Sequence, residues 1–105
     1  MNPRHGEVWL ADMGIAGKTR PVIVLLADPV PVERTLIIHV PVTRQARGGP
    51  LEVSPGHLPF LDRESVANTQ AIGALPRVRF EKWLGNLPAA DLAKVKAAVK
   101  IACAL

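Results

Sequence analysis

The chain has 105 residues and a formal net charge of +4 at pH 7, so it is expected to form one domain over residues 1–105. Hydrophobic residues make up 49% and charged residues 21%, which excludes a disordered chain, and no apolar run approaches the ~20 residues of a membrane span. The single cysteine excludes an intrachain disulfide or a cysteine metal cluster, and the N-terminus lacks the apolar segment of a signal peptide, so a cytoplasmic protein is expected.

The first half of the chain predicts short antiparallel strands. Ten prolines and eight glycines favour short β elements over a helix bundle. The first strand is expected over Glu7–Asp12, with Trp9 in the core. The short connection over residues 13–18 makes the next strand its antiparallel neighbour. That strand contains six apolar residues in a row, 22–27, which is typical of a strand buried on both faces.

An arginine and a proline, Arg20 and Pro21, stand at the entrance of this apolar strand. Arginine is always charged and rarely lies inside a core. Arg20 therefore has two interpretations. Either it is held at a buried N-terminal end of the strand, where it binds an anionic ligand, or it is a surface arginine whose aliphatic stem covers the end of the strand. Arginine exposure in proteins generally favours the surface interpretation when the segment is considered alone.

The third strand is expected over residues 35–42, after a loop over 28–34 whose prolines remove ladder donors. Alternate residues of a strand point to opposite faces. His39 and Thr43 therefore share a face, provided that no bulge intervenes.

The second half of the chain predicts loops, two further strands and one clear helix. We expect a basic loop over 43–50, a short strand over Leu51–Val53, a loop over 54–59 and a single turn at 62–64. A strand over 65–72 and a turn over 73–76 are expected to follow, and then one or two helical turns over 77–84 closed by Gly85. The chain is expected to end in an amphipathic helix over 89–104, with Cys103 in the core. The predicted fold is mainly β (α+β), a small bent sheet or barrel with the C-terminal helix packed against it.

The order of these segments resembles the MazF/PemK family of toxin endoribonucleases. The most specific feature is Arg-Pro at the start of an apolar strand, followed about twenty residues later by Pro-x-Thr. The segments that carry the resemblance are Gly6–Asp12, Thr19–Leu25, Val40–Thr43, Ser65–Gln70 and the final helix with Asp91 and Leu92.

The resemblance implies an SH3-like β-barrel of about five to seven short strands and a homodimer. It further implies the toxin of a type II toxin–antitoxin system, a sequence-selective endoribonuclease that cleaves single-stranded RNA without a metal or cofactor. In this family an acidic antitoxin protein commonly neutralises the toxin, and the positive net charge suits both RNA and such a partner. The resemblance makes Arg20 and Thr43 the central active-site residues.

The chemistry of RNA explains these residue types. RNA carries its own nucleophile, the 2′-OH, whose attack on the neighbouring phosphorus gives a 2′,3′-cyclic phosphate and a 5′-OH. A guanidinium such as Arg20 matches the developing phosphoryl charge, and the hydroxyl of Thr43 can donate to it. His39 is a candidate general base because imidazole titrates near neutrality. Candidate RNA-binding residues are Lys18, Arg44, Gln45, Arg47, Asn68 and Gln70.

Two positions depart from the family pattern. Several members carry an acidic residue just before the glutamine that matches Gln70, and some carry an arginine two positions earlier. Here these places hold Thr69 and Ala67, so an acid–base pair built from them cannot operate. His39 keeps two interpretations, a general base or a residue that fills a strand position.

The departure leaves a second functional hypothesis open. The chain could be a non-catalytic toxin or binding module of the same barrel, acting by protein contact as gyrase inhibitors of this fold do, or by RNA binding.

Overall fold

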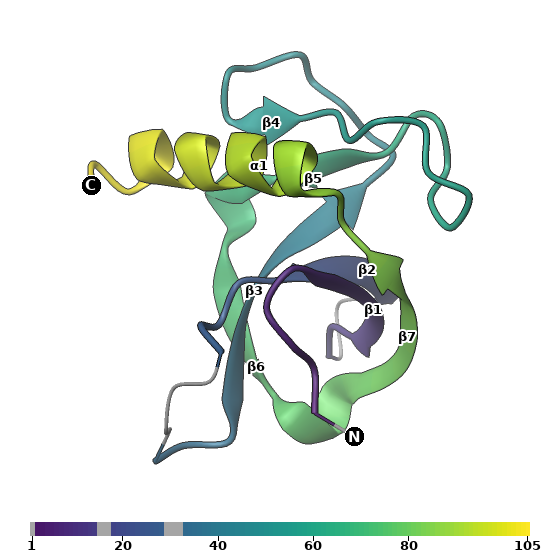
Figure 1. The fold of residues 1–105 in the computed structure, drawn as a ribbon, viewed down its shortest axis with the longest axis vertical. Helices are drawn as coiled ribbons and strands as arrows, with labels where there is room; N and C mark the ends of the chain where they lie inside the picture. Colours follow the sequence, from purple (N-terminus) through teal and green to yellow (C-terminus); the bar gives the residue numbers. More distant parts are fainter. Residues whose placement is uncertain (1, 15–17, 29–32) are drawn as a thin grey trace.

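Seven strands and one C-terminal helix form from the described part of the chain, residues 2–14, 18–28 and 33–105 of a computed structural model (Figure 1). The elements are β1 (Glu7–Asp12), β2 (Thr19–Val24), β3 (Leu36–Thr43), β4 (Glu52–Val53), β5 (Val66–Asn68), β6 (Gly73–Pro76), β7 (Phe80–Asn86) and α1 (Ala89–Ala102), with 3₁₀ turns η1 (Thr69–Ala71) and η2 (Arg77–Arg79).

The strands form one antiparallel sheet that curls strongly, in the order β4-β5-β3-β2-β1-β7. β3 is the longest strand, and one of its edges pairs with two different strands. Its N-terminal half pairs with β6 and its C-terminal end with β5. The register between β1 and β7 shifts twice, which bends the sheet further. The predicted mainly β fold with a C-terminal helix is confirmed.

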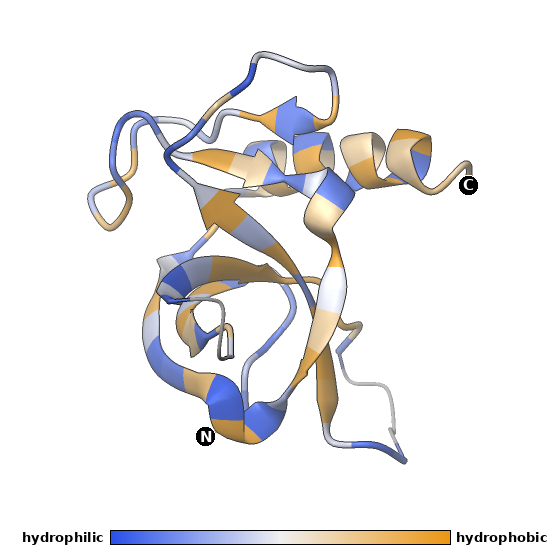
Figure 2. Ribbon diagram, turned by 180° about the vertical axis from the view of Figure 1, so that it is seen from behind, coloured by the Kyte–Doolittle hydropathy of each residue, from blue (hydrophilic) through white to orange (hydrophobic). Residues whose placement is uncertain are grey.

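The strand β2 is buried on both faces over Val22–Val24, as predicted, but it ends at Val24. Leu25 and Leu26 are only half-buried and Ala27 is exposed, so the predicted run of six buried strand residues was too long. Ile23 packs in a core cluster with residues of β1, β3 and α1, whereas Val22 and Val24 pack in a second cluster with Trp9 and Phe80. Full burial of each such side chain stabilises the fold by roughly 1.5–3 kcal/mol. Figure 2 shows hydrophobic residues predominating along β3, whereas β7 alternates between hydrophobic and hydrophilic residues. β2 is therefore a rigid support for the residues at its N-terminal end.

Three predictions for the segment after β5 were wrong. The predicted strand over 65–72 ends at Asn68 and continues as η1. The predicted turn over 73–76 is strand β6, which pairs with β3. The predicted helical turns over 77–84 are limited to η2, after which β7 runs through Gly85 and pairs with β1. The physical reason is tertiary, because partner strands distant in the sequence overrode the local glycine and proline signals.

The prediction for the end of the helix was also too long. α1 ends at Ala102, and Ala104 adopts a left-handed φ of 55° that stops the helix. Cys103 therefore lies exposed beyond the last turn, which corrects the prediction of a core cysteine. The buried face of α1 carries Val95 and Ala98. Within the residues the structure describes, no helix is long and apolar enough to cross a membrane.

Replacing Gly85 with alanine is expected to destabilise the fold by about 1–3 kcal/mol through overpacking. A Cβ at this position would lie 2.6 Å from Cδ2 and 2.8 Å from Cζ of the Phe60 ring. Urea unfolding measures the change. Gly49→Ala is the matched control, because its Cβ would meet nothing within 4 Å. Equal stability of the two variants would contradict the close packing of Phe60 on β7.

Candidate active site

Two neighbouring hollows open where β2 begins and β3 ends. The first, the Lys18 hollow, has a volume of about 690 Å³ and is bounded by the segment over 59–65. The second, the Gln70 hollow, has a volume of about 740 Å³ and is bounded by the loop over 45–52 and by the end of β5. Both volumes lie in the range of clefts that hold small ligands. The hollows share four lining residues, Arg20, Val42, Thr43 and Gln45.

The pairing of β2 with β3 brings the arginine and the threonine together. Val22 lies opposite Pro41 in the last pair between β2 and β3, and Arg20 and Thr43 each lie two residues beyond that pair. Both residues line both hollows. Arg20 and Thr43 thus form a ridge between the two hollows. This juxtaposition follows from the two strands alone, without any contribution from the loops.

Arg20 lies on the surface at the rim of both hollows, and not at a buried mouth of β2. Three other arginines, Arg4, Arg44 and Arg79, form ion pairs with carboxylates, whereas Arg34, Arg47, Arg63 and Arg77 form none among the described residues. Arg44 pairs with Asp62 at 3.2 Å and Arg79 with Asp12 at 3.4 Å. No carboxylate among the described residues lies within ion-pair distance of Arg20, so its guanidinium is available to an anionic ligand.

The hydroxyl of Thr43 has a fixed environment. The backbone N–H of Gln45 donates to Thr43 Oγ1 at 3.1 Å, in the manner of a short polar turn. The oxygen is therefore already used as an acceptor, and the hydroxyl hydrogen remains to be donated. Beside the guanidinium of Arg20, this arrangement offers converging donors to a phosphate.

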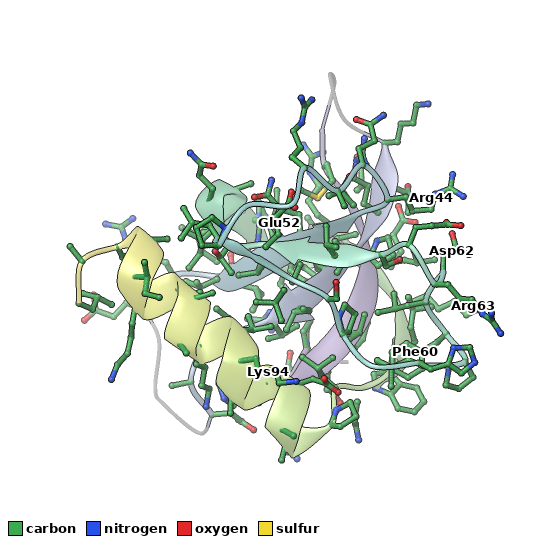
Figure 3. All side chains as sticks on the ribbon, turned by 90° about the horizontal axis from the view of Figure 1, so that it is seen from above. Arg44, Glu52, Phe60, Asp62, Arg63 and Lys94 are labelled. Atoms are coloured by element: carbon green, nitrogen blue, oxygen red, sulfur yellow. The ribbon has the colours of Figure 1, made fainter. Side chains whose placement is uncertain are left out.

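The candidate RNA-binding residues all line the hollows. Lys18 and Arg44 line the first hollow, Gln45 lines both, and the Gln70 hollow is lined by Arg47, Asn68 and Gln70. Arg44 lies beside Asp62 on one side of the molecule (Figure 3). Cations thus surround the Arg20–Thr43 ridge on both sides, while amide side chains gather around the second hollow.

The structure does not bring His39 to the hollows. His39 shares a strand face with Thr43, as expected, but the two lie four positions apart along β3, roughly 13 Å at 3.3 Å per residue. His39 is 3% exposed, its ring lies edge-on to Phe80, and its Nδ1 is 3.3 Å from the Ile37 carbonyl oxygen. It fills the second core cluster.

The burial of His39 predicts a pH-dependent stability. Burial lowers the pKa of His39 from its ordinary value of 6.5, and the hydrogen bond to Ile37 opposes this only in part. The unfolded imidazole then binds a proton at a higher pH than the folded one. The contribution of the neutral, buried His39 to the free energy of unfolding is therefore fully present above about pH 6.5. It decreases as the pH falls toward the lowered pKa of the folded state, by at most about 1.4 kcal/mol per pH unit.

In His39→Gln we expect this decrease to be absent. Urea unfolding of both proteins between about pH 5 and pH 8, a range around the histidine pKa, measures the difference. Parallel pH profiles of stability would contradict a neutral buried imidazole.

Sequence reasoning missed the carboxylates and apolar residues that line the hollows. Asp62 and Glu64 line the Lys18 hollow together with Phe60, and Glu52 lines the Gln70 hollow with Met13. Asp62 and Glu64 belong to a predicted turn, and no spacing pattern connects them with β2 or β3. Only the path of the loop back along the sheet brings them to the site.

Thr69 is fully buried. Its hydroxyl donates to the Leu51 carbonyl at 2.5 Å, and its own N–H donates to the same oxygen at 3.1 Å. Thr69 therefore fixes β4 against the end of β5. Among the described residues, no group of three or more His, Cys, Asp or Glu side chains could hold a metal ion.

Comparison with known proteins identifies the family. A family model described as PemK-like, MazF-like toxin of type II toxin–antitoxin system matches residues 4–103. A curated relative from Mycobacterium tuberculosis, "Probable endoribonuclease MazF2", is 34% identical over 93 residues, covering 85% of this chain and 86% of the relative.

Solved structures of MazF proteins have the same fold as this chain. The crystal structure of MazF (Form-I) from Deinococcus radiodurans matches with a TM-score of 0.84 and 27% identity, over 100% of this chain and 99% of that one. An endoribonuclease in complex with its cognate antitoxin, from a mycobacterial species, has the same fold at a TM-score of 0.85 and 22% identity, covering 98% of this chain and 96% of that chain. This chain belongs to the PemK-like, MazF-like toxin family of type II toxin–antitoxin systems.

Proposed function

We propose that this protein is an endoribonuclease toxin that cleaves single-stranded RNA across the Arg20–Thr43 ridge, by attack of the 2′-OH and without a metal or cofactor. One observation carries the proposal. An exposed guanidinium without a carboxylate partner among the described residues and an oriented threonine hydroxyl are shared by two cation-rich hollows. The relative from M. tuberculosis is named a probable endoribonuclease, which supports the reaction class.

The reaction needs charge stabilisation at one phosphate. As the 2′-oxygen attacks, negative charge grows on the phosphoryl oxygens, and donors already in place stabilise that charge without reorganisation. The forked guanidinium of Arg20 can donate two hydrogen bonds to these oxygens, and the hydroxyl of Thr43 can donate one more to the same phosphate. The nucleophile belongs to the substrate, so no metal is required to generate one.

The two hollows give the RNA strand a path. With the scissile phosphate on the ridge, one flanking nucleotide enters the Lys18 hollow and the other enters the Gln70 hollow. Lys18, Arg44 and Arg47 are placed to bind phosphates, which hold the strand but read no bases. Gln45, Asn68 and Gln70 carry amides that can hydrogen-bond base edges. This division of roles is our basis for sequence-selective cleavage.

Incubation of the purified protein with mixed RNA in excess chelator tests the proposal. We expect discrete fragments with 5′-OH ends, which polynucleotide kinase labels without prior phosphatase treatment. Intact RNA together with growth arrest on expression would favour the second functional hypothesis, a non-catalytic toxin that acts by contact with another protein.

We further propose that an acidic antitoxin protein binds this toxin in the cytoplasm, where its RNA substrate lies. A neighbouring fold is described as an endoribonuclease in complex with its cognate antitoxin. The net charge of +4 suits an acidic partner as well as RNA.

We also propose that residues 1–105 form a single toxin domain that associates as a homodimer. β6 is paired on one side only within the described residues, and an unpaired strand edge offers hydrogen-bonding groups to another chain. Leu36 and Ile38 of the adjacent strand are apolar yet 40% and 42% exposed. Their cross-strand partners on β6, Pro76 and Ala74, are exposed as well. An apolar face beside a free edge is typical of an interface between copies.

Ile38→Lys is expected to convert the dimer to a monomer, because it places a charge in the apolar face. Size-exclusion chromatography with light scattering measures the mass. Glu81→Lys, at an exposed position of β7, is the control and is expected to keep the wild-type mass. A dimeric Ile38→Lys variant, or a monomeric wild-type protein, would contradict this interface.

A further inference from the structure

The proposed reaction has no assigned group to remove the 2′-OH proton. Guanidinium groups are not deprotonated in proteins, and a neutral hydroxyl such as that of Thr43 is too weak a base for this step. Thr69 is fully buried, and its hydroxyl donates to the Leu51 carbonyl. His39 lies in the core, outside both hollows. The base must therefore be another residue that lines the hollows.

Most carboxylates of the chain already have a hydrogen-bond or ion-pair partner. The chain has nine Asp and Glu residues, all of which lie in the described ranges. Six of them accept a hydrogen bond or form an ion pair, namely Glu7, Asp12, Asp28, Glu52, Asp62 and Asp91. The three without such a partner among the described residues are Glu33, Glu64 and Glu81. Of these three, only Glu64 lines a hollow that contains both Arg20 and Thr43.

The other carboxylates at the hollows are occupied. Glu52 Oε1 accepts the backbone N–H groups of Arg47 at 2.8 Å and Gly48 at 2.9 Å, so it holds the loop that bounds the Gln70 hollow. Asp62 pairs with Arg44 at 3.2 Å. Each carboxylate already stabilises local structure and would have to give up that partner to accept a substrate proton. Glu64 would give up none.

Glu64 lies beside the ridge, in the turn that leads into β5. Thr43 lies opposite Val66 in the pairing of β3 with β5, and Glu64 precedes Val66 by two residues. Glu64 lines the Lys18 hollow together with Arg20 and Thr43. Glu64, Thr43 and Arg20 thus come from three adjacent segments that converge on one hollow.

We infer that Glu64 is the general base of the reaction proposed above, on which this inference rests. Its carboxylate takes the proton of the 2′-OH, and the oxygen lone pair forms the bond from O2′ to phosphorus. The bond from phosphorus to O5′ breaks, and O5′ leaves with the electron pair and takes a proton from a solvent water. The hydroxide so formed is neutralised by the proton that Glu64 releases. The products are a 2′,3′-cyclic phosphate and a 5′-OH, with no net consumption of water.

The test compares kcat, KM and pH profiles of Glu64→Gln with those of the wild type. The substrate is a synthetic RNA containing a site that wild-type protein cuts in mixed RNA. We expect kcat to fall by about 10²-fold or more, with KM nearly unchanged, because general bases contribute about 10²–10⁴-fold. The acid limb of the wild-type pH–rate profile should disappear. Added formate or acetate should restore part of the activity of Glu64→Ala, and none of the activity of Arg20→Ala.

Glu81→Gln is the matched control, since it removes an exposed carboxylate that lines neither hollow. It should cleave at the wild-type rate. Thermal unfolding of Glu64→Gln checks that this exposed substitution leaves the fold intact. A Glu64→Gln variant with wild-type kcat, or with a loss confined to KM and an unchanged pH profile, overturns the inference and leaves the proposed function standing. Wild-type protein that leaves RNA intact overturns both.

Discussion

Arg20→Ala is expected to slow RNA cleavage by about 10³-fold while the protein stays folded. Removal of one preorganised donor to a transition-state oxyanion costs about 10²–10³-fold in kcat, and a guanidinium supplies two such donors. Arg20 is exposed and has no carboxylate partner among the described residues, so its removal breaks no ion pair. Single-turnover cleavage of a synthetic RNA measures the loss directly.

Two further variants separate geometry from charge. Arg20→Lys keeps the charge but not the fork, and should recover only a small part of the rate. Arg63→Ala removes a nearby exposed arginine that lines neither the Lys18 hollow nor the Gln70 hollow, and should retain wild-type kcat. If Arg20→Ala cleaves within threefold of wild type, the ridge is not the reaction centre.

The second large effect is expected at Thr43. Thr43→Val preserves the shape of the side chain but removes the hydroxyl, and should lower kcat by about 10²-fold. Thr43→Ser keeps the hydroxyl and should retain most of the activity. The same hydroxyl accepts the Gln45 N–H, so loss of that turn predicts an increase in KM as well.

The ratio of these two changes identifies the role of Thr43. A loss mainly in kcat indicates a donor to the reacting phosphate, whereas a loss confined to KM indicates a residue that only shapes the loop after β3. Thr35→Val, an exposed threonine just before the same strand, is the control and should behave as wild type. Equal activity of Thr43→Val and Thr43→Ser would contradict a catalytic hydroxyl.

The helices and strands that were predicted correctly are those whose own residues show a clear local pattern. β1, β2 and β3 follow from apolar runs bounded by glycine and proline, and α1 follows from helical spacing. The juxtaposition of Arg20 with Thr43 was also predictable, because both stand at the ends of neighbouring antiparallel strands. The half of the fold that carries this ridge is therefore specified largely by short-range sequence.

The rest depended on contacts between distant segments. β6 has the local sequence of a turn because it contains Gly73 and Pro76, and it becomes a strand only because one edge of β3 is free there. β7 has the local sequence of helical turns and becomes a strand beside β1. At the site, the loop that delivers Asp62 and Glu64 carries no periodic pattern. For His39, the alternation of side chains predicts the correct face of β3 but not the distance from Thr43 or the burial of the imidazole.

The most direct test of attack by the 2′-OH replaces one oxygen in the substrate. A synthetic RNA is prepared with a single 2′-deoxynucleotide on the 5′ side of the scissile phosphate and compared with the all-ribose strand, in excess chelator. We expect the all-ribose strand to be cut to a 2′,3′-cyclic phosphate, detected by mass spectrometry, and the substituted strand to remain intact while still binding. Cleavage of the substituted strand at a comparable rate would contradict attack by the 2′-OH, and with it the role of the Arg20–Thr43 ridge as the reaction centre.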